Sequence, residues 1–118
     1  MDGKLDMLYV PVRDAKSALA FYHDQLGFEE AWREGETTIV FKLPGTDVKL
    51  MIEQHEGEIT ETPGPLFMLP SIDDFFAQQG DTTVFIQTPI DIPVGRWAVT
   101  KDPSGNTLYF IDFSKKEE

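Results

Sequence analysis

Two segments of the chain carry apolar residues at helical spacing, and eight short runs are rich in β-branched and aromatic residues. Ala18, Tyr22 and Leu26 lie four positions apart, which predicts an amphipathic helix over residues 14–27. Apolar residues within residues 71–80 recur three or four positions apart and predict a second helix. The predicted strands cover residues 6–12, 28–32, 37–43, 48–53, 65–69, 82–88, 96–101 and 107–113.

Capping residues mark the ends of both predicted helices. Asp14 and Ser71 belong to the residue types that accept hydrogen bonds from the first free backbone N–H groups of a helix. Gly27 and Gly80 follow the last helical positions, where glycine commonly ends a helix. Two adjacent aspartates in the first turn of the second helix point in different directions, so we interpret them as favouring the helix N-terminus electrostatically.

The order of elements occurs twice along the chain. Asp14 and Ser71 lie 57 positions apart, and the turns at Pro44 and Pro103 lie 59 positions apart. Each half reads as strand, helix and three strands, and a polar stretch rich in Gly, Pro and Thr separates the halves. We predict one α+β domain, residues 1–118, with two βαβββ modules in tandem, residues 5–54 and 64–113, and a linker, residues 55–63.

The charge balance excludes one class of function and leaves two interpretations open. With 21 acidic against 10 basic residues, the net charge is −11, and the chain lacks the basic stripe that nucleic-acid binding requires. The acidity is typical of a highly soluble protein, and it would also attract cationic ligands. The sequence contains no cysteine, no apolar run of membrane-spanning length and no signal-peptide core at its N-terminus. We expect a cytoplasmic protein that binds neither nucleic acid nor membranes.

Two stretches resemble a known family. "VRDAKSALAFYHDQLGF", residues 12–28, resembles the end of the first strand and the helix of the vicinal oxygen chelate superfamily. "GRWAVTKDPSGNTLYF", residues 95–110, resembles its closing hairpin. This superfamily includes glyoxalase I, extradiol dioxygenases, fosfomycin-resistance enzymes and bleomycin-resistance proteins. The resemblance implies that the two modules form curled mixed sheets around a cleft, and it favours a homodimer.

Metal-dependent members of this superfamily hold their ion on the cleft faces of four strands. The resemblance places those ligand positions at Met7, Met51, Gly64 and Tyr109. Divalent ions prefer imidazole nitrogen and carboxylate oxygen, and none of these four residues supplies either. We therefore expect no metal ion and no other cofactor.

The two histidines are interpreted as solvated. His23 lies on the helix face opposite the apolar stripe. His55 follows a strand into the polar linker beside Glu53 and Glu56, which we interpret as a solvated acidic loop rather than a metal site. Glu53 stays a candidate for the cleft, because alternation with Met51 places both on one face of the strand.

Strand alternation, combined with the face that the resemblance assigns to the cleft, predicts the cleft lining. The predicted ligand-binding residues are Met7, Tyr9, Met51, Glu53, Leu66, Met68, Trp97, Tyr109 and Ile111, with Val99 and Phe113 beside them. The opposite strand faces are expected to pack beneath the helices, and they contribute Leu8, Val10, Leu50, Ile52, Phe67, Leu108 and Phe110. Such a lining suits a flat or cationic organic molecule. The same side chains would equally fill an ordinary core or a dimer interface.

Three functions stay open at this level. We favour a metal-free protein that binds a small cationic or aromatic organic molecule, similar to the bleomycin-resistance proteins. The alternative is a metal-dependent lyase, transferase or dioxygenase of the same superfamily, which the missing ligands disfavour. The third is an interaction module, or a metal-free enzyme in which Tyr9, Tyr109 and Glu53 perform acid–base work if they lie within hydrogen-bonding reach. The sequence alone assigns no catalytic residue.

Overall fold

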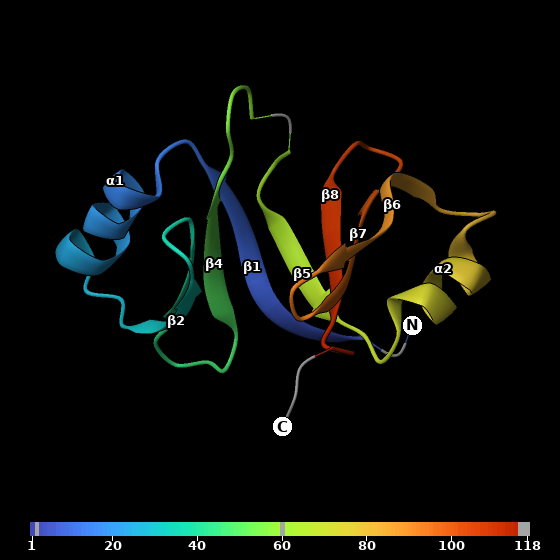
Figure 1. Cartoon of the computed structure of the whole chain (residues 1–118), viewed down its shortest axis with the longest axis horizontal. Helices are drawn as coiled ribbons and strands as arrows, with labels where there is room; N and C mark the ends of the chain where they lie inside the picture. Colours follow the sequence, from blue (N-terminus) through green and yellow to red (C-terminus); the bar gives the residue numbers. More distant parts are fainter. Residues whose placement is uncertain (2, 60, 116–118) are drawn as a thin grey trace. The chain divides into compact units, whose positions relative to one another are not determined.

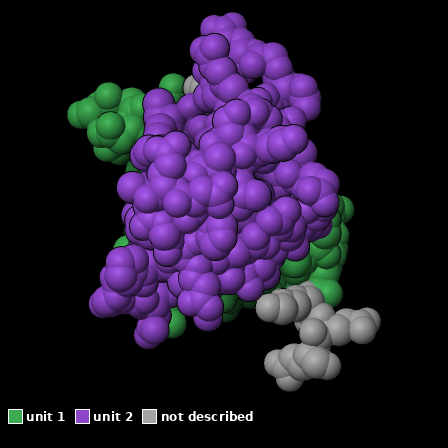
Figure 2. Space-filling view, turned by 90° about the vertical axis from the view of Figure 1, so that its left-hand side faces the viewer, with its two compact units in different colours: residues 1–5, 64–118 green, residues 6–63 purple. Residues whose placement is uncertain are grey.

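The chain folds into two compact units, each built around one strand–helix–three-strand module (Figure 1). The computed structural model describes residues 1, 3–59 and 61–115. One unit spans residues 6–63, and the other combines residues 1–5 with residues 64–118 (Figure 2). The predicted α+β fold with two βαβββ modules is confirmed. No helix of the described residues has the length and apolar character needed to cross a membrane.

The first module carries a four-stranded mixed sheet. Its strands are β1 (Lys4–Val12), β2 (Glu30–Glu34), β3 (Thr38–Lys42) and β4 (Lys49–Gln54), in the spatial order β2-β3-β4-β1. β1 and β4 run parallel with Tyr9 opposite Met51, whereas β3 is antiparallel to both β2 and β4. Helix α1 (Ala15–Leu19) continues into a π-helical segment, η1 (Ala20–Gln25), so the predicted helix is present with a wider second half.

The second module has the same topology. Its elements are β5 (Gly64–Met68), α2 (Ile72–Gln79), β6 (Val84–Ile92), β7 (Gly95–Lys101) and β8 (Thr107–Asp112). The spatial order is β5-β8-β7-β6. β5 and β8 run parallel with Leu66 opposite Tyr109, and β7 is antiparallel to both β8 and β6. The parallel pair in each module therefore joins its first strand to its last.

In both modules the helix packs against one face of the sheet. The first core centres on Ile39, Phe41, Leu50 and Ile52, and the second centres on Leu69, Ile72, Ala98 and Phe110. Six of the residues predicted to pack beneath the helices belong to these cores: Val10, Leu50, Ile52, Phe67, Leu108 and Phe110. Leu8 does not, since 38% of its surface is exposed. The first core includes β1 residues Val10 and Val12, so Leu8 lies beyond its edge.

Both predicted helix caps are confirmed. The Asp14 carboxylate accepts a hydrogen bond from the backbone N–H of Ser17 at 3.2 Å. The Ser71 hydroxyl oxygen accepts one from the backbone N–H of Asp74 at 3.1 Å. These side chains satisfy N–H groups that have no partner within the helix itself. Gly27 follows η1 with a φ of 80°, a conformation that glycine adopts without steric cost.

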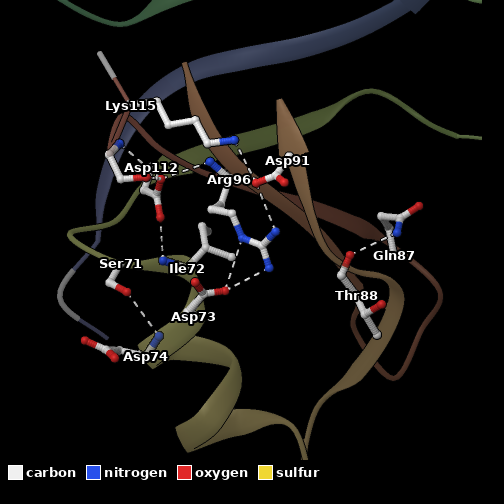
Figure 3. A network of polar contacts seen from close by, with 11 residues as sticks. Ser71, Ile72, Asp73, Asp74, Gln87, Thr88, Asp91, Arg96, Asp112 and Lys115 are labelled. Carbon is white, nitrogen blue, oxygen red and sulfur yellow. Dashed lines mark hydrogen bonds and ion pairs between the residues drawn. The ribbon is translucent and has the colours of Figure 1, made fainter. Parts of the chain in front are cut away.

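In each module, a side chain at the end of the last strand accepts a hydrogen bond from the first backbone N–H of the helix. Gln54 Oε1, at the end of β4, accepts from the backbone N–H of Ala15 at 2.9 Å. Asp112 Oδ2, at the end of β8, accepts from the backbone N–H of Ile72 at 2.8 Å (Figure 3). Ala15 and Ile72 are the first residues of α1 and α2, so the two modules use the same device. We call these two contacts the helix clasps.

The Asp112 clasp is the more heavily bonded of the two. Asp112 is 2% exposed, and its Oδ1 accepts from the Arg96 backbone N–H at 2.9 Å (Figure 3). The same oxygen accepts from the Ser114 hydroxyl at 2.7 Å. Burial alone raises the pKa of Asp112, but the N–H of Ile72 and the donors of Ser114 and Arg96 outweigh it and hold the pKa below its usual range. A side chain at Gly95 would come within 2.2 Å of the Asp112 carbonyl oxygen, so glycine is required beside this clasp.

A set of ion pairs surrounds the Asp112 clasp (Figure 3). The Arg96 guanidinium contacts Asp73 Oδ1 at 2.9 Å and Asp91 Oδ1 at 3.2 Å, and Lys115 Nζ lies 2.8 Å from the same Asp91 oxygen. Asp73 is one of the two adjacent aspartates in the first turn of α2. Asp73 therefore lies at the helix N-terminus and also forms an ion pair that joins α2 to Arg96 on β7. The spacing of residues along the helix does not predict this second contact.

Candidate functional site

Polar side chains gather in the first module on the sheet face opposite the helix core. Tyr9 on β1 lies opposite Met51 on β4, and Glu53 follows Met51 by two positions, so Tyr9 and Glu53 share a face. Val10 and Ile52, each one position away, belong to the helix-side core. Glu53 therefore lies where its alternation with Met51 predicts.

The Tyr9 hydroxyl links two other side chains. It donates a hydrogen bond to Glu53 Oε1 at 2.5 Å, and its oxygen lies 2.8 Å from His55 Nε2. Because the hydroxyl proton is directed at Glu53, His55 Nε2 must carry a proton to donate to the hydroxyl oxygen. Thr38 Oγ1, on β3, donates to the other Glu53 oxygen at 3.2 Å. Both oxygens of the Glu53 carboxylate are thus held by hydroxyl groups.

A second carboxylate completes the group. Glu61 Oε2 lies 3.7 Å from His55 Nε2, and Glu53 Oε1 lies 3.8 Å from the same nitrogen. Burial raises the pKa of Glu61, the charge of His55 lowers it, and the charge of Glu53 raises it again, with a net upward shift. We refer to Tyr9, Thr38, Glu53, His55 and Glu61 as the Tyr9 cluster.

The cluster combines a buried hydroxyl with accessible ionisable groups. Tyr9 is 1% exposed, whereas 40% of the Glu53 side chain is exposed. The side chains of His55 and Glu61 are 23% and 26% exposed. A small solute can therefore reach the Glu53 carboxylate, while the hydroxyl that orients it is shielded from water.

The structure corrects the interpretation of His55. His55 is not a solvated linker residue, because its Nε2 contacts the Tyr9 hydroxyl and its side chain is largely buried. Its backbone N–H donates to the Val12 carbonyl at 2.9 Å, which extends the β1–β4 ladder past the end of β4. The alternation Met51, Glu53, His55 was a sequence signal for this position. His23 is exposed as expected, and its Nδ1 lies 2.8 Å from the Phe28 carbonyl oxygen.

The remaining predicted lining residues are buried or half-buried. Met7 and Met51 are buried on the same sheet face as Tyr9. In the second module, Leu66, Val99, Tyr109 and Ile111 are buried, and Met68, Trp97 and Phe113 are half-buried. The Trp97 and Tyr109 rings lie 5.7 Å apart. Met68 and Phe113 border a hollow of about 380 Å³ that Lys4, Leu69, Pro70 and Ser114 also line.

The four positions that the resemblance assigns to metal ligands do not fit a divalent ion. Met7 and Met51 offer buried thioethers, and Tyr109 offers a buried phenol. Gly64 has no side chain, and a Cβ atom there would lie 2.3 Å from the Thr107 carbonyl oxygen. Across residues 1, 3–59 and 61–115, no three His, Cys, Asp or Glu side chains are placed to hold a metal ion, and this includes the Tyr9 cluster.

Comparison with protein families finds one match over most of the chain. Residues 4–110 match the model of the family described as Glyoxalase/Bleomycin resistance protein/Dioxygenase superfamily. No curated protein matches the sequence.

Solved structures with the same fold cover nearly the whole chain. The hypothetical protein BH1468 from Bacillus halodurans C-125 is 16% identical, with a TM-score of 0.72 over 100% of this chain and 99% of its own. A structure described as NAD-dependent benzaldehyde dehydrogenase from Legionella pneumophila is 20% identical, with a TM-score of 0.75 over 92% and 98%. Methylmalonyl-CoA epimerase from Streptomyces coelicolor, in complex with 2-nitronate-propionyl-CoA, is 17% identical, with a TM-score of 0.72 over 100% and 99%. At these identities the similarity concerns the fold alone.

Proposed function

The chain belongs to the glyoxalase/bleomycin resistance protein/dioxygenase superfamily, and on that premise we propose that it binds a small organic cation without a metal ion. The observation that carries the proposal is the convergence of two carboxylates in the Tyr9 cluster. Glu53 and Glu61 both approach His55 Nε2 to within 4 Å, at 3.8 and 3.7 Å. His55 Nε2 itself occupies the point that they share, so a ligand cation would lie beside this nitrogen, where the two carboxylates supply a negative potential.

The hydrogen bonds of the cluster favour a preorganised site. Tyr9 and Thr38 donate to the two Glu53 oxygens, so this carboxylate needs little reorganisation when a cation approaches. The net charge of −11 adds a long-range attraction for cations, which salt weakens.

The same charges disfavour anionic ligands. Coenzyme A carries phosphate groups, and a thioester of it is the ligand of the Streptomyces coelicolor epimerase complex. Two carboxylates at the binding point would repel such an anion unless His55 were protonated. We therefore assign this chain a cationic ligand rather than that of the epimerase.

Calorimetric titration with benzyltrimethylammonium tests the proposal, with benzyl alcohol as an uncharged aromatic control. We expect the cation to bind with a Kd of about 0.1–1 mM, equivalent to about 4–5.5 kcal/mol, and the alcohol not to bind measurably. Glu53→Gln and Glu61→Gln should each weaken binding about fivefold to tenfold, since each removes one charge from the site. Glu34→Gln, an exposed glutamate at the end of β2, is the charge-matched control.

Equal binding to the wild-type protein and to the Glu53→Gln, Glu61→Gln double variant would overturn the proposal. The metal content of the protein after dialysis against Ni²⁺, Zn²⁺, Mn²⁺ and Fe²⁺ distinguishes the proposed metal-free binding protein from a metal-dependent enzyme. We expect far less than one ion per chain, and a stoichiometric ion would favour the enzyme. The homodimer that the resemblance favours is tested in the same samples by light scattering.

A further inference from the structure

We infer that the hollow of about 380 Å³ in the unit with the second module is a further ligand site, and that it takes an organic monocarboxylate with an apolar body. The described residues that line it are Lys4, Met68, Leu69, Pro70, Phe113 and Ser114, and we call it the Lys4 hollow. None of these residues belongs to the Tyr9 cluster. The inference is therefore independent of the proposed function.

The walls of the Lys4 hollow are mainly apolar. Four of its described lining residues carry apolar side chains: Met68, Leu69, Pro70 and Phe113. Its volume of about 380 Å³ lies within the range of about 300–1,000 Å³ that is typical of small-molecule sites. An aromatic or branched aliphatic group is stabilised when such walls remove it from water, and the Met68 side chain can adapt to its shape.

Hydrogen bonds hold the backbone on two sides of the Lys4 hollow. The backbone N–H of Leu69 donates to the Ile111 carbonyl at 2.9 Å, which extends the β5–β8 pair past the end of β5. The backbone N–H of Lys115 donates to the Val94 carbonyl at 3.0 Å and holds the chain that follows β8. Because these walls are already ordered, a ligand loses little binding free energy to ordering them.

Lys4 is the one charged residue among the described residues of the lining. Lys42 and Lys115 each lie near a carboxylate, at 3.6 and 2.8 Å. Lys4, in contrast, forms no ion pair with any residue that the structure describes, although the chain carries 21 acidic residues. An exposed ammonium group on a flexible stem beside an apolar wall can contact the carboxylate of a ligand that lies against the wall.

The surrounding charges favour a single negative charge on the ligand. The Ser114 hydroxyl donates to Asp112 Oδ1 at 2.7 Å, so it is engaged and Lys4 is the main donor for an anion. The net charge of −11 repels anions at long range. A ligand with several negative charges would meet this repulsion with one lysine to offset it. A monocarboxylate that gains most of its affinity from an apolar body fits these conditions best.

The methyl signals of the four methionines report on this site and on the Tyr9 cluster in one NMR spectrum. Met68 lines the Lys4 hollow, whereas Met7 and Met51 are buried on the sheet face of Tyr9. Cinnamate is titrated into protein with labelled methionine methyl groups, and Met68→Leu assigns the signal. We expect the Met68 signal to shift with a Kd of about 1 mM while those of Met7 and Met51 stay in place.

Two further compounds separate the contributions of the charge and the apolar body. Cinnamyl alcohol has the same ring and chain without the negative charge, and we expect it to bind about fivefold more weakly than cinnamate. Acetate has the carboxylate without the apolar body, and we expect no measurable shift of Met68. Equal binding of cinnamate and cinnamyl alcohol would overturn the assignment of an anionic ligand.

Variants test the same two contributions from the side of the protein. Lys4→Gln should weaken cinnamate about fivefold and leave cinnamyl alcohol unchanged, and Lys4→Arg should keep cinnamate within about twofold. Phe113→Leu should weaken both compounds, because it reduces the apolar wall. Lys101→Gln is the charge-matched control, since Lys101 is exposed and pairs with Thr107 at the opposite end of β8 from Phe113. It should bind both compounds as the wild type does.

The remaining outcomes also decide the matter. No shift of Met68 in folded wild-type protein at about 10 mM cinnamate would overturn the site. Equal cinnamate affinity in the wild type and Lys4→Gln would overturn the role of Lys4. A shift of Met51 in place of Met68 would put the acid on the Tyr9 face and would overturn the inference as well. Failure of benzyltrimethylammonium to bind would overturn the proposed function and leave this inference standing.

Discussion

Apolar residues in the second module occupy the positions that the Tyr9 cluster occupies in the first. In the parallel pair β5–β8, Leu66 lies opposite Tyr109 as Tyr9 lies opposite Met51 in β1–β4. Ile111 and Phe113 then stand two and four positions after Tyr109, where Glu53 and His55 stand after Met51. Ile111 is 3% exposed, whereas 40% of the Glu53 side chain is exposed.

The helix clasps, in contrast, are present in both modules. Gln54 and Asp112 end the last strand of each module, and each accepts from the first backbone N–H of its helix. The acceptor is neutral in one module and charged in the other, and the charged one has additional donors from Arg96 and Ser114. The helix clasps occur in both modules, which is typical of contacts that the fold requires. The Tyr9 cluster occurs in one module only, which makes it a candidate for function.

The largest expected effect comes from placing the polar chemistry of the first module into the second. Ile111→Glu would bury a carboxylate among apolar side chains, and we expect a loss of about 4 kcal/mol in the free energy of unfolding. Glu53→Ile in the first module should cost about 1 kcal/mol or less, since Tyr9 keeps His55 as a partner. Urea denaturation of both variants measures the difference. Similar losses would mean that the two positions are not distinct in environment.

The next effect compares the two clasps. Asp112→Ala leaves the buried N–H group of Ile72 and the half-buried N–H group of Arg96 without their acceptor, and we expect a loss of about 3 kcal/mol in the free energy of unfolding. Gln54→Ala removes one neutral hydrogen bond and should cost about 1 kcal/mol. The thermal unfolding midpoints of the two variants give the comparison. If Gln54→Ala costs as much as Asp112→Ala, the additional donors at Asp112 contribute nothing.

A titration separates the clasps further. The pKa of Asp112 is lower in the folded chain than the value of about 3.9 for an unfolded aspartate, so its ionised form stabilises the fold. That contribution is complete above about pH 4 and is lost as the pH falls through the folded pKa. We expect Asp112→Asn to be less acid-sensitive than the wild type in this range, and Gln54→Glu to be no less sensitive. Parallel stability curves for Asp112→Asn and the wild type would contradict this.

The smallest effect concerns Glu61 in the Tyr9 cluster. Because burial raises its pKa, Glu61 takes up a proton at a higher pH than an ordinary glutamate, and the site then loses one negative charge. As the pH is lowered, the affinity for benzyltrimethylammonium should therefore begin to fall before the pH reaches the ordinary glutamate pKa of about 4.3. The total loss of binding free energy should be about 1 kcal/mol. Glu61→Gln should remove this part of the pH dependence. The same titration of Glu34→Gln should match the wild type.

Local patterns predicted the modules because every element has its own signal. Caps at Asp14 and Ser71 and the helical spacing after them placed both helices. Boundaries were less accurate where tertiary contacts decide them. The strand predicted to end at Thr88 continues through Pro89 to Ile92, because β6 is the edge strand of its sheet and has irregular register there. Proline is tolerated on an edge strand, where its missing N–H is not needed.

The candidate site was only partly predictable. Alternation placed Tyr9 and Glu53 on one face, and the same alternation continues to His55. Whether a residue beyond a strand end keeps that alternation depends on a contact with another strand, here the bond from the His55 N–H to the Val12 carbonyl. Glu61 has no local signal, since its approach to His55 depends on the path of the loop between β4 and β5.

One unit of the fold is discontinuous in the chain, and this sets an order of assembly during synthesis. Residues 1–5 belong with residues 64–118, and Gly3 lies so near Leu69 that a Cβ atom would come within 2.6 Å of its side chain. The ribosome releases all of residues 6–63, including the Tyr9 cluster, before most of the other unit exists. The Tyr9 cluster can therefore form on the nascent chain before residues 1–5 meet the segment with which they pack. We expect a fusion tag ahead of residue 1 to affect the folding of the unit that contains residues 64–118 more than that of the unit that contains the Tyr9 cluster.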